Sequence, residues 1–168
     1  VKSHGGYIDV SSEKEKGTTF TLYLPASEKK AVQEKAVPTE MFRGTGTILL
    51  IDDEKMILDV GCELLEELGY TVLSALSGQE ALQIFQKNST KIDLVIMDMI
   101  MPGMSGGETF DRLRNINQDI KVLLSSGYSL NGQATQILRR GCDGFIQKPF
   151  NLNQLAEKIG SIIGSAKD

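Results

Sequence analysis

The chain has 168 residues, 40% of them hydrophobic, which is enough for one domain with a core and some additional length. Its 18 basic and 22 acidic residues leave a formal net charge of −4, so the overall charge does not favour nucleic acid or an anionic membrane as a partner. The sequence shows no signal-peptide pattern and no apolar run near the roughly 18 residues of a membrane span. We therefore expect a cytoplasmic module that contacts neither nucleic acid nor membrane, whether or not its parent protein is membrane-anchored.

The chain begins at Val1 rather than at a methionine, and we expect it to be a piece of a longer protein. Cys62 and Cys142 are too few for a disulfide framework or a thiolate metal site. Both are interpreted as buried thiols in a reducing compartment.

The first 25 residues differ from the rest of the chain. Polar and apolar residues alternate in 7–10 and again in 18–24, around a charged turn, and this pattern predicts a β-hairpin. Residues 26–45 are rich in Lys, Glu, Ala and Gln without a sustained apolar stripe, which indicates a linker. Because a lone hairpin is marginally stable and its edges tend to pair, we expect it to dock on the following domain or to form a homodimer with a second copy.

After residue 46, short apolar runs alternate with amphipathic segments, which is the pattern of βα units around a parallel sheet. The expected strands are residues 47–51, 70–75, 94–97, 121–125 and 144–146. Helices are expected from near Lys55, from a capping box of Ser77 and Glu80, over 106–114, over 131–140 and around Leu155 to Ile163. The sequence therefore predicts a doubly wound α/β domain, whose ligand chemistry gathers at the carboxyl ends of its strands.

Carboxylates follow two of the expected strands. Asp52 and Asp53 come directly after 47–51, and Asp98 comes directly after 94–97. If these strands are neighbours, the acids converge at one edge of the sheet, where each disfavours the ionisation of the others. A cation resolves that conflict, and an all-oxygen ligand set favours a hard ion such as Mg²⁺. For Asp52 and Asp53 alone, capping of the next helix is an equally good interpretation.

The last two expected strands also end in polar residues. Ser126 and Gly127 follow the fourth strand, and Lys148 and Pro149 follow the fifth. A lysine near acids either neutralises them or contacts a phosphoryl oxygen, and a hydroxyl suits the second role as well. The Lys148–Pro149 bond invites a cis isomer, which the sequence leaves open.

These residues together resemble a response-regulator receiver domain of bacterial two-component systems. The resemblance runs from about Thr47 to Ala166 and rests on the acid pair Asp52–Asp53, "IMDMIMPGMSG" around Asp98, "LLSSGY" and "KPF". It implies a flavodoxin-like five-stranded parallel sheet with strand order 2-1-3-4-5.

The resemblance also implies roles for the site residues. Asp98 would accept a phosphoryl group from a phosphohistidine, with Mg²⁺ held by Asp53, Asp98 and the Ile100 backbone carbonyl, and with Asp52 acting through water. Ser126 and Lys148 would each contact a phosphoryl oxygen. Such chemistry is physically sound, because a carboxylate attacks phosphorus in line only when the charge on the phosphoryl oxygens is neutralised.

A conformational switch is implied as well. Ser126 would be drawn toward the phosphoryl group while Phe145 rotates inward, and the face of the fourth helix, fifth strand and fifth helix would change. Phe145 stands where the family often has Tyr or His, and plain core packing is its alternative reading. Ile100 and Tyr128 are bulky residues expected beside the phosphorylated carboxylate, so we expect slow loss of the phosphoryl group to water.

The first 25 residues resemble the extreme C-terminal end of the ATP-binding domain of a sensor histidine kinase, most specifically over 17–25. The order kinase end (1–25), linker (26–45) and receiver (46–168) implies a hybrid histidine kinase. Its partner would be the kinase dimerisation and phosphoacceptor domain or a histidine phosphotransfer protein. The nucleotide-binding boxes are absent from this chain, so we expect no ATP binding and no turnover by it, and His4 is interpreted as a surface histidine.

Two other functions fit parts of the pattern. One is an interaction module whose acidic site is vestigial and is never phosphorylated. The other is a Mg²⁺-dependent phosphohydrolase with Asp98 as nucleophile, although such enzymes generally carry a second aspartate two residues on, where this chain has Ile100.

Overall fold

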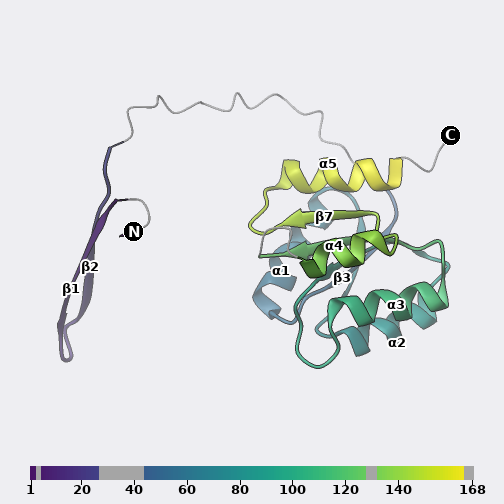
Figure 1. The fold of residues 1–168 in the computed structure, drawn as a ribbon, viewed down its shortest axis with the longest axis horizontal. Helices are drawn as coiled ribbons and strands as arrows, with labels where there is room; N and C mark the ends of the chain where they lie inside the picture. The colour runs from purple at the N-terminus through teal and green to yellow at the C-terminus, as the bar shows by residue number, and fades with distance from the viewer. Residues whose placement is uncertain (3–4, 27–43, 128–131, 165–168) are drawn as a thin grey trace. The chain divides into compact units, whose positions relative to one another are not determined.

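The computed structural model describes residues 1–2, 5–26, 44–127 and 132–164, with the side chain of residue 133 excepted (Figure 1). His4, Tyr128 and nearly all of the expected linker therefore lie outside the described residues. The chain divides into two compact units, residues 1–37 and 38–168, and each is described by itself.

The first unit contains the predicted hairpin. Strands β1 (Tyr7–Glu13) and β2 (Gly17–Tyr23) pair antiparallel, and every residue of both strands is exposed. The register sets Ile8 opposite Leu22 and Val10 opposite Phe20. Because directly opposed residues of an antiparallel pair share a face, these four side chains form an apolar face on one side of the hairpin.

The second unit is built on a five-stranded parallel sheet with the order β4-β3-β5-β6-β7. The strands are β3 (Thr47–Ile51), β4 (Thr71–Ala75), β5 (Ile92–Asp98), β6 (Lys121–Ser126) and β7 (Gly144–Gln147). Renumbered within this unit, the order is the predicted 2-1-3-4-5. Asp98 is the last residue of β5 and Ser126 is the last residue of β6. The sequence predicted that each would be the first residue after its strand.

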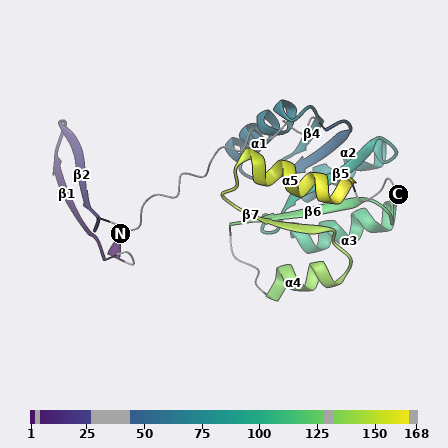
Figure 2. The ribbon, with the colours of Figure 1, turned by 90° about the horizontal axis from the view of Figure 1, so that it is seen from above.

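Helices cover both faces of the sheet (Figure 2). They are α1 (Lys55–Glu67), α2 (Gly78–Asn88), α3 (Gly106–Ile116), α4 (Gly132–Arg139) and α5 (Leu152–Ile163). Helices α1 and α5 pack on one face and α2, α3 and α4 on the other, so the sheet separates two hydrophobic cores. Within the described part of the chain, no helix is long and apolar enough to cross a membrane.

Alternation along each strand sends its side chains to the two cores in turn. In β3, Ile48 and Leu50 join the α1/α5 core, whereas Leu49 and Ile51 join the other. The buried strands therefore read as unbroken apolar runs, as expected for a parallel sheet covered on both faces.

The capping of α2 and α5 differs from what the sequence predicted. The Ser77 hydroxyl accepts from the Glu80 amide as expected, but the Glu80 carboxylate accepts from the amide of Leu76 rather than from that of Ser77. The predicted capping box is therefore wrong in its reciprocal half. A complete capping box begins α5 instead, between Asn151 and Gln154.

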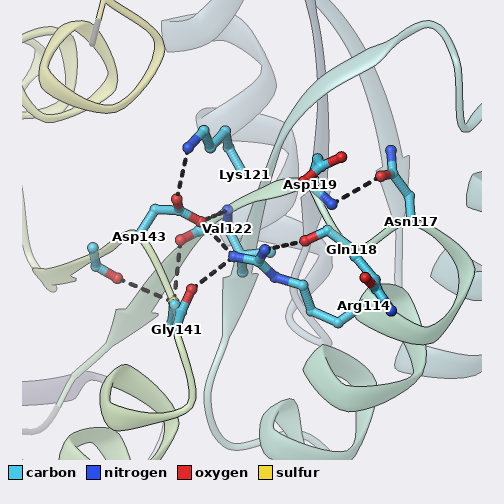
Figure 3. Close-up of polar contacts among 10 residues, drawn as sticks. Arg114, Asn117, Gln118, Asp119, Lys121, Val122, Gly141 and Asp143 are labelled. Carbon is cyan, nitrogen blue, oxygen red and sulfur yellow. Dashed lines mark hydrogen bonds and ion pairs between the residues drawn. The ribbon is translucent and has the colours of Figure 1, made fainter. Parts of the chain in front are cut away.

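A polar cluster at the amino-terminal ends of β6 and β7 fixes the position of the last strand (Figure 3). The Asp143 carboxylate accepts from the Val122 amide at 2.9 Å and pairs with Arg114 at 3.0 Å and Lys121 at 3.2 Å. Arg114 also donates to backbone carbonyls in the segments that follow α3 and α4. This Asp143 cluster holds β7 in register with β6 and so positions Lys148 at the far end of β7.

Candidate functional site

Three charged side chains meet at the carboxyl ends of the strands. Lys148 Nζ lies 2.5 Å from Asp52 Oδ2 and 2.8 Å from Asp98 Oδ1, and all three side chains are largely buried. Strand alternation explains their convergence, because each lies two residues after a strand residue of the α1/α5 core and so points to the same face. The lysine reaches across from the edge strand to the two central strands.

Backbone amides orient both carboxylates. The Ile100 amide donates to Asp98 Oδ2 at 2.8 Å, and the Glu54 amide donates to Asp52 Oδ1 at 3.0 Å. Each carboxylate thus has one oxygen fixed by the loop that follows its strand and the other turned to Lys148. The helix-capping interpretation of Asp52 and Asp53 is wrong, because the N-cap of α1 is Glu54, no side chain caps this helix, and the backbone amide from which Asp52 accepts is that of Glu54.

The pKa of Lys148 lies above its ordinary value. Burial alone would lower this pKa, but the hydrogen bonds that the ammonium donates to Asp52 and Asp98 outweigh it, and the charges of the two carboxylates act in the same direction. The lysine is therefore a fixed positive charge at neutral pH.

The other predicted site residues are distributed around this trio. Asp53 is exposed and lines a groove together with Asp98, Ile100 and Ser126. Ser126 is buried at the end of β6 and lines the same groove as Asp98 and Lys148. Phe145 is partly buried and packs against the core formed by α2, α3 and α4, away from the acids. The Lys148–Pro149 bond is cis.

The predicted set of three acids does not form a cluster. Among the described residues, no group of three or more histidine, cysteine or acidic side chains could hold a metal ion by itself. Lys148 lies where the sequence predicted a metal, between the carboxylates of Asp52 and Asp98. The positive charge between the two acids in the structure is the Lys148 ammonium, and the predicted metal ion stays a prediction.

The groove beside Asp98 is a feature that the sequence analysis missed. It has a volume of about 810 Å³, and we call it the α1 groove. Its apolar lining comes from Met56, Val60, Leu64, Ile100, Pro149 and Phe150. Met56 is 80% exposed and Ile100 is 51% exposed. The spacing of Met56, Val60 and Leu64 by four residues was the available signal, since it marks one stripe on α1.

Residues 48–160 match the profile of the response regulator receiver domain. The chain belongs to this family. Solved structures of receiver domains are similar to this chain. A response regulator receiver domain protein from Clostridium thermocellum has a TM-score of 0.70 and 34% identity, over 73% of this chain and 97% of that one. The receiver domain of the hybrid histidine kinase CckA has a TM-score of 0.60 and 35% identity, over 70% of this chain and 99% of that one.

Among curated proteins, the sensor kinase CckA of Brucella abortus is 37% identical over 172 residues, which is 97% of this chain and 18% of the relative. The aerobic respiration control sensor protein ArcB of Escherichia coli is 30% identical over 162 residues, or 95% of this chain and 21% of the relative. This receiver chain thus spans about a fifth of the length of these sensor kinases and is homologous to the portion that contains their receiver.

Proposed function

We propose that Asp98 is the phosphoacceptor of a phosphorelay and takes its phosphoryl group from a phosphohistidine. A carboxylate oxygen of Asp98 attacks phosphorus, the P–N bond breaks, and the imidazole nitrogen of the donor keeps the electron pair and takes up a proton. The observation that carries this proposal is the buried pairing of Asp98 with Lys148, at the strand end where receiver domains have their acceptor. The Lys148 ammonium neutralises one phosphoryl oxygen, and the Ser126 hydroxyl bonds another.

The residues present also fit a Mg²⁺ ion. Asp52 and Asp98 already share one cation, and the Ile100 carbonyl and the exposed Asp53 supply further oxygens at the same groove. Mg²⁺ needs only one or two carboxylates because it keeps several waters. Receiver domains generally bind this ion, and a CheY of the same fold from Borrelia burgdorferi has been solved with BeF₃ and Mg²⁺. When bound, the ion neutralises charge on the transferring group.

The α1 groove is the docking site for the helix that carries the donor histidine. Its apolar stripe leads directly to Asp98, and the exposed acids Asp53, Glu54, Asp59 and Glu63 flank it. A helix with an apolar face and basic flanks complements this surface, and it would bring its histidine to the acceptor. Such a helix belongs to the dimerisation and phosphoacceptor domain of a histidine kinase or to a histidine phosphotransfer protein.

The hairpin is the C-terminal end of a kinase ATP-binding domain, followed by a linker and the receiver. The alignments to CckA and ArcB cover 97% and 95% of this chain, so they extend into the hairpin as well as the receiver. In this arrangement the parent is a hybrid histidine kinase, and the receiver works in the cytoplasm, where the kinase finds its ATP. Phosphorylation then changes the face formed by α4, β7 and α5 through Ser126 and Phe145.

The test is intact-mass analysis after incubation with acetyl phosphate, with and without Mg²⁺. We expect the parent chain to gain one phosphoryl group only with Mg²⁺, and Asp98→Asn to gain none. The matched control is Asp119→Asn, an exposed aspartate at the opposite end of the sheet, which should gain the group like the parent.

Failure of the parent to gain mass, together with failure to bind BeF₃⁻, would favour an interaction module with a vestigial site. Continuous release of phosphate, with hydrolysis of a phosphoester such as p-nitrophenyl phosphate, would favour the hydrolase. That outcome is disfavoured by Ile100, whose apolar side chain stands where such enzymes carry their second aspartate.

A further inference from the structure

A buried serine beside the acceptor strand has no role in the proposed chemistry. Ser125 is only 3% exposed, and its hydroxyl finds no hydrogen-bond partner among the residues that the structure describes. A buried hydroxyl without a partner is unfavourable, so its presence in a family of conserved architecture needs a physical reason.

The position of Ser125 suggests that reason. It pairs in register with Asp98 on β5 and with Ile146 on β7. Ser125 lies two residues after Leu123, which belongs to the α1/α5 core, so its side chain shares that face with Asp98 and Lys148.

The side chain of Lys148 crosses β6 to reach the acids. Lys148 begins at the end of β7 and reaches Asp98 on β5, with β6 lying between them. Because neighbouring strands are about 4.8 Å apart, the lysine stem must cross the full width of β6, on the face that carries Ser125. Its ammonium donates to Asp52 and Asp98, which leaves a third N–H.

A divalent cation between Asp52 and Asp98 changes which hydrogen-bond acceptors the Lys148 ammonium can contact. A cation bound by Asp52 and Asp98 takes the oxygens that the ammonium now contacts, and two positive charges at such short range repel each other. The ammonium then moves away from β3, back along its own stem and over β6. The Ser125 oxygen lies along that path and can accept an N–H.

We propose that Ser125 is a positioning residue that accepts a hydrogen bond from Lys148 when a divalent cation occupies the acid pair. The inference rests on the proposed function and deepens it. Ser125 keeps the displaced ammonium beside Asp98, where the phosphoryl oxygens arrive, instead of letting it turn out to solvent.

The experiment measures Mg²⁺ affinity by calorimetry on the full 168-residue chain, without any phosphoryl donor. Ser125→Ala should weaken Mg²⁺ binding by about tenfold or more, which is the contribution of one hydrogen bond to a charged group. In a Lys148→Met background the same substitution should change the affinity by less than about twofold, because the donor is gone. Ser125→Thr retains the hydroxyl and should bind like the parent.

Ser11→Ala is the control for loss of a serine hydroxyl, because Ser11 is an exposed residue of β1 outside the site, and the Mg²⁺ affinity of this variant should stay within about twofold of the parent. Without Mg²⁺, Ser125→Ala should melt at the same or a higher temperature than the parent, since it loses an unpaired hydroxyl. Equal Mg²⁺ affinity in the parent and Ser125→Ala would overturn the inference and leave the proposed function standing. So would a loss of Mg²⁺ affinity on Ser125→Ala that is the same in the parent and in the Lys148→Met background. A parent that binds no Mg²⁺ overturns the proposed function and the inference with it.

Discussion

The hairpin and the receiver use similar residues to make very different sheets. The hairpin strands alternate, with Ile8, Val10, Phe20 and Leu22 on one face, and all of them are exposed. In the receiver, the unbroken apolar run of β3 is buried on both faces. The receiver carries the helices that cover its sheet, whereas no residue that the structure describes in the first unit covers the apolar face of the hairpin. An alternating pattern thus specifies a sheet that needs a partner, and a continuous run specifies a sheet enclosed by its own chain.

The largest expected contrast comes from removing a phenylalanine from each unit. Phe85 is fully buried in the receiver core, and Phe85→Ala should lower the free energy of unfolding by about 3–5 kcal/mol. Phe20→Ala on the exposed hairpin should change it by less than about 0.5 kcal/mol. Urea denaturation followed by circular dichroism measures both. Equal effects would mean that the hairpin is packed as tightly as the receiver in solution.

The apolar face of the hairpin should drive association of two copies. Burying the Val10 and Phe20 side chains contributes roughly 1.5–3 kcal/mol each, so replacing both with lysine should weaken association by more than tenfold. Light scattering coupled to size exclusion gives the mass of the full chain, of this double variant, and of a chain that lacks residues 1–26. A parent that stays monomeric at every concentration would rule out the homodimer.

Loss of a polar contact should also destabilise the receiver more than the hairpin. Asp143→Ala leaves the Val122 amide and Arg114 without their acceptor and should cost the receiver about 2 kcal/mol. Glu13→Ala removes the exposed pair with Lys16 on the hairpin and should cost at most about 1 kcal/mol. Thermal melting of the two variants measures both losses of stability. A loss in Glu13→Ala as large as that in Asp143→Ala would contradict the prediction.

The smallest effect is a difference in thiol reactivity. Burial is the main cause that raises the pKa of the Cys142 thiol, so at pH 8 less thiolate is present in the folded chain than in the unfolded one. Iodoacetamide should therefore modify Cys142 several times more slowly in buffer than in urea. A cysteine introduced at the exposed Thr21 of the hairpin should react at nearly the same rate in both, which mass spectrometry can follow.

Local patterns were enough to predict much of the receiver. The five strands and the positions of Asp52, Asp98 and Lys148 at one edge follow from apolar runs that end in polar residues. The order of the strands was implied by the family resemblance and not by those runs. The hairpin was predicted equally well, because its alternation and its turn are local.

Contacts between distant segments could not be predicted in the same way. The Asp143 cluster joins residues that are 21 to 29 positions apart, and nothing local in the sequence marks Arg114 as a partner of Asp143. The sequence placed a metal among the acids because like charges need a counter-charge, and that requirement is also met by Lys148. Which cation occupies the pair depends on solution conditions, which a sequence does not contain.

The two ion pairs of Lys148 join residues that are far apart along the chain. Lys148 is 96 positions from Asp52 and 50 positions from Asp98. During synthesis, a growing chain that has already exposed Asp98 still lacks its lysine until β7 has left the ribosome. Under the proposed function, an incomplete molecule would carry Asp98 without the ammonium that neutralises a phosphoryl oxygen, and only chains whose last strand is in place would take part in the relay.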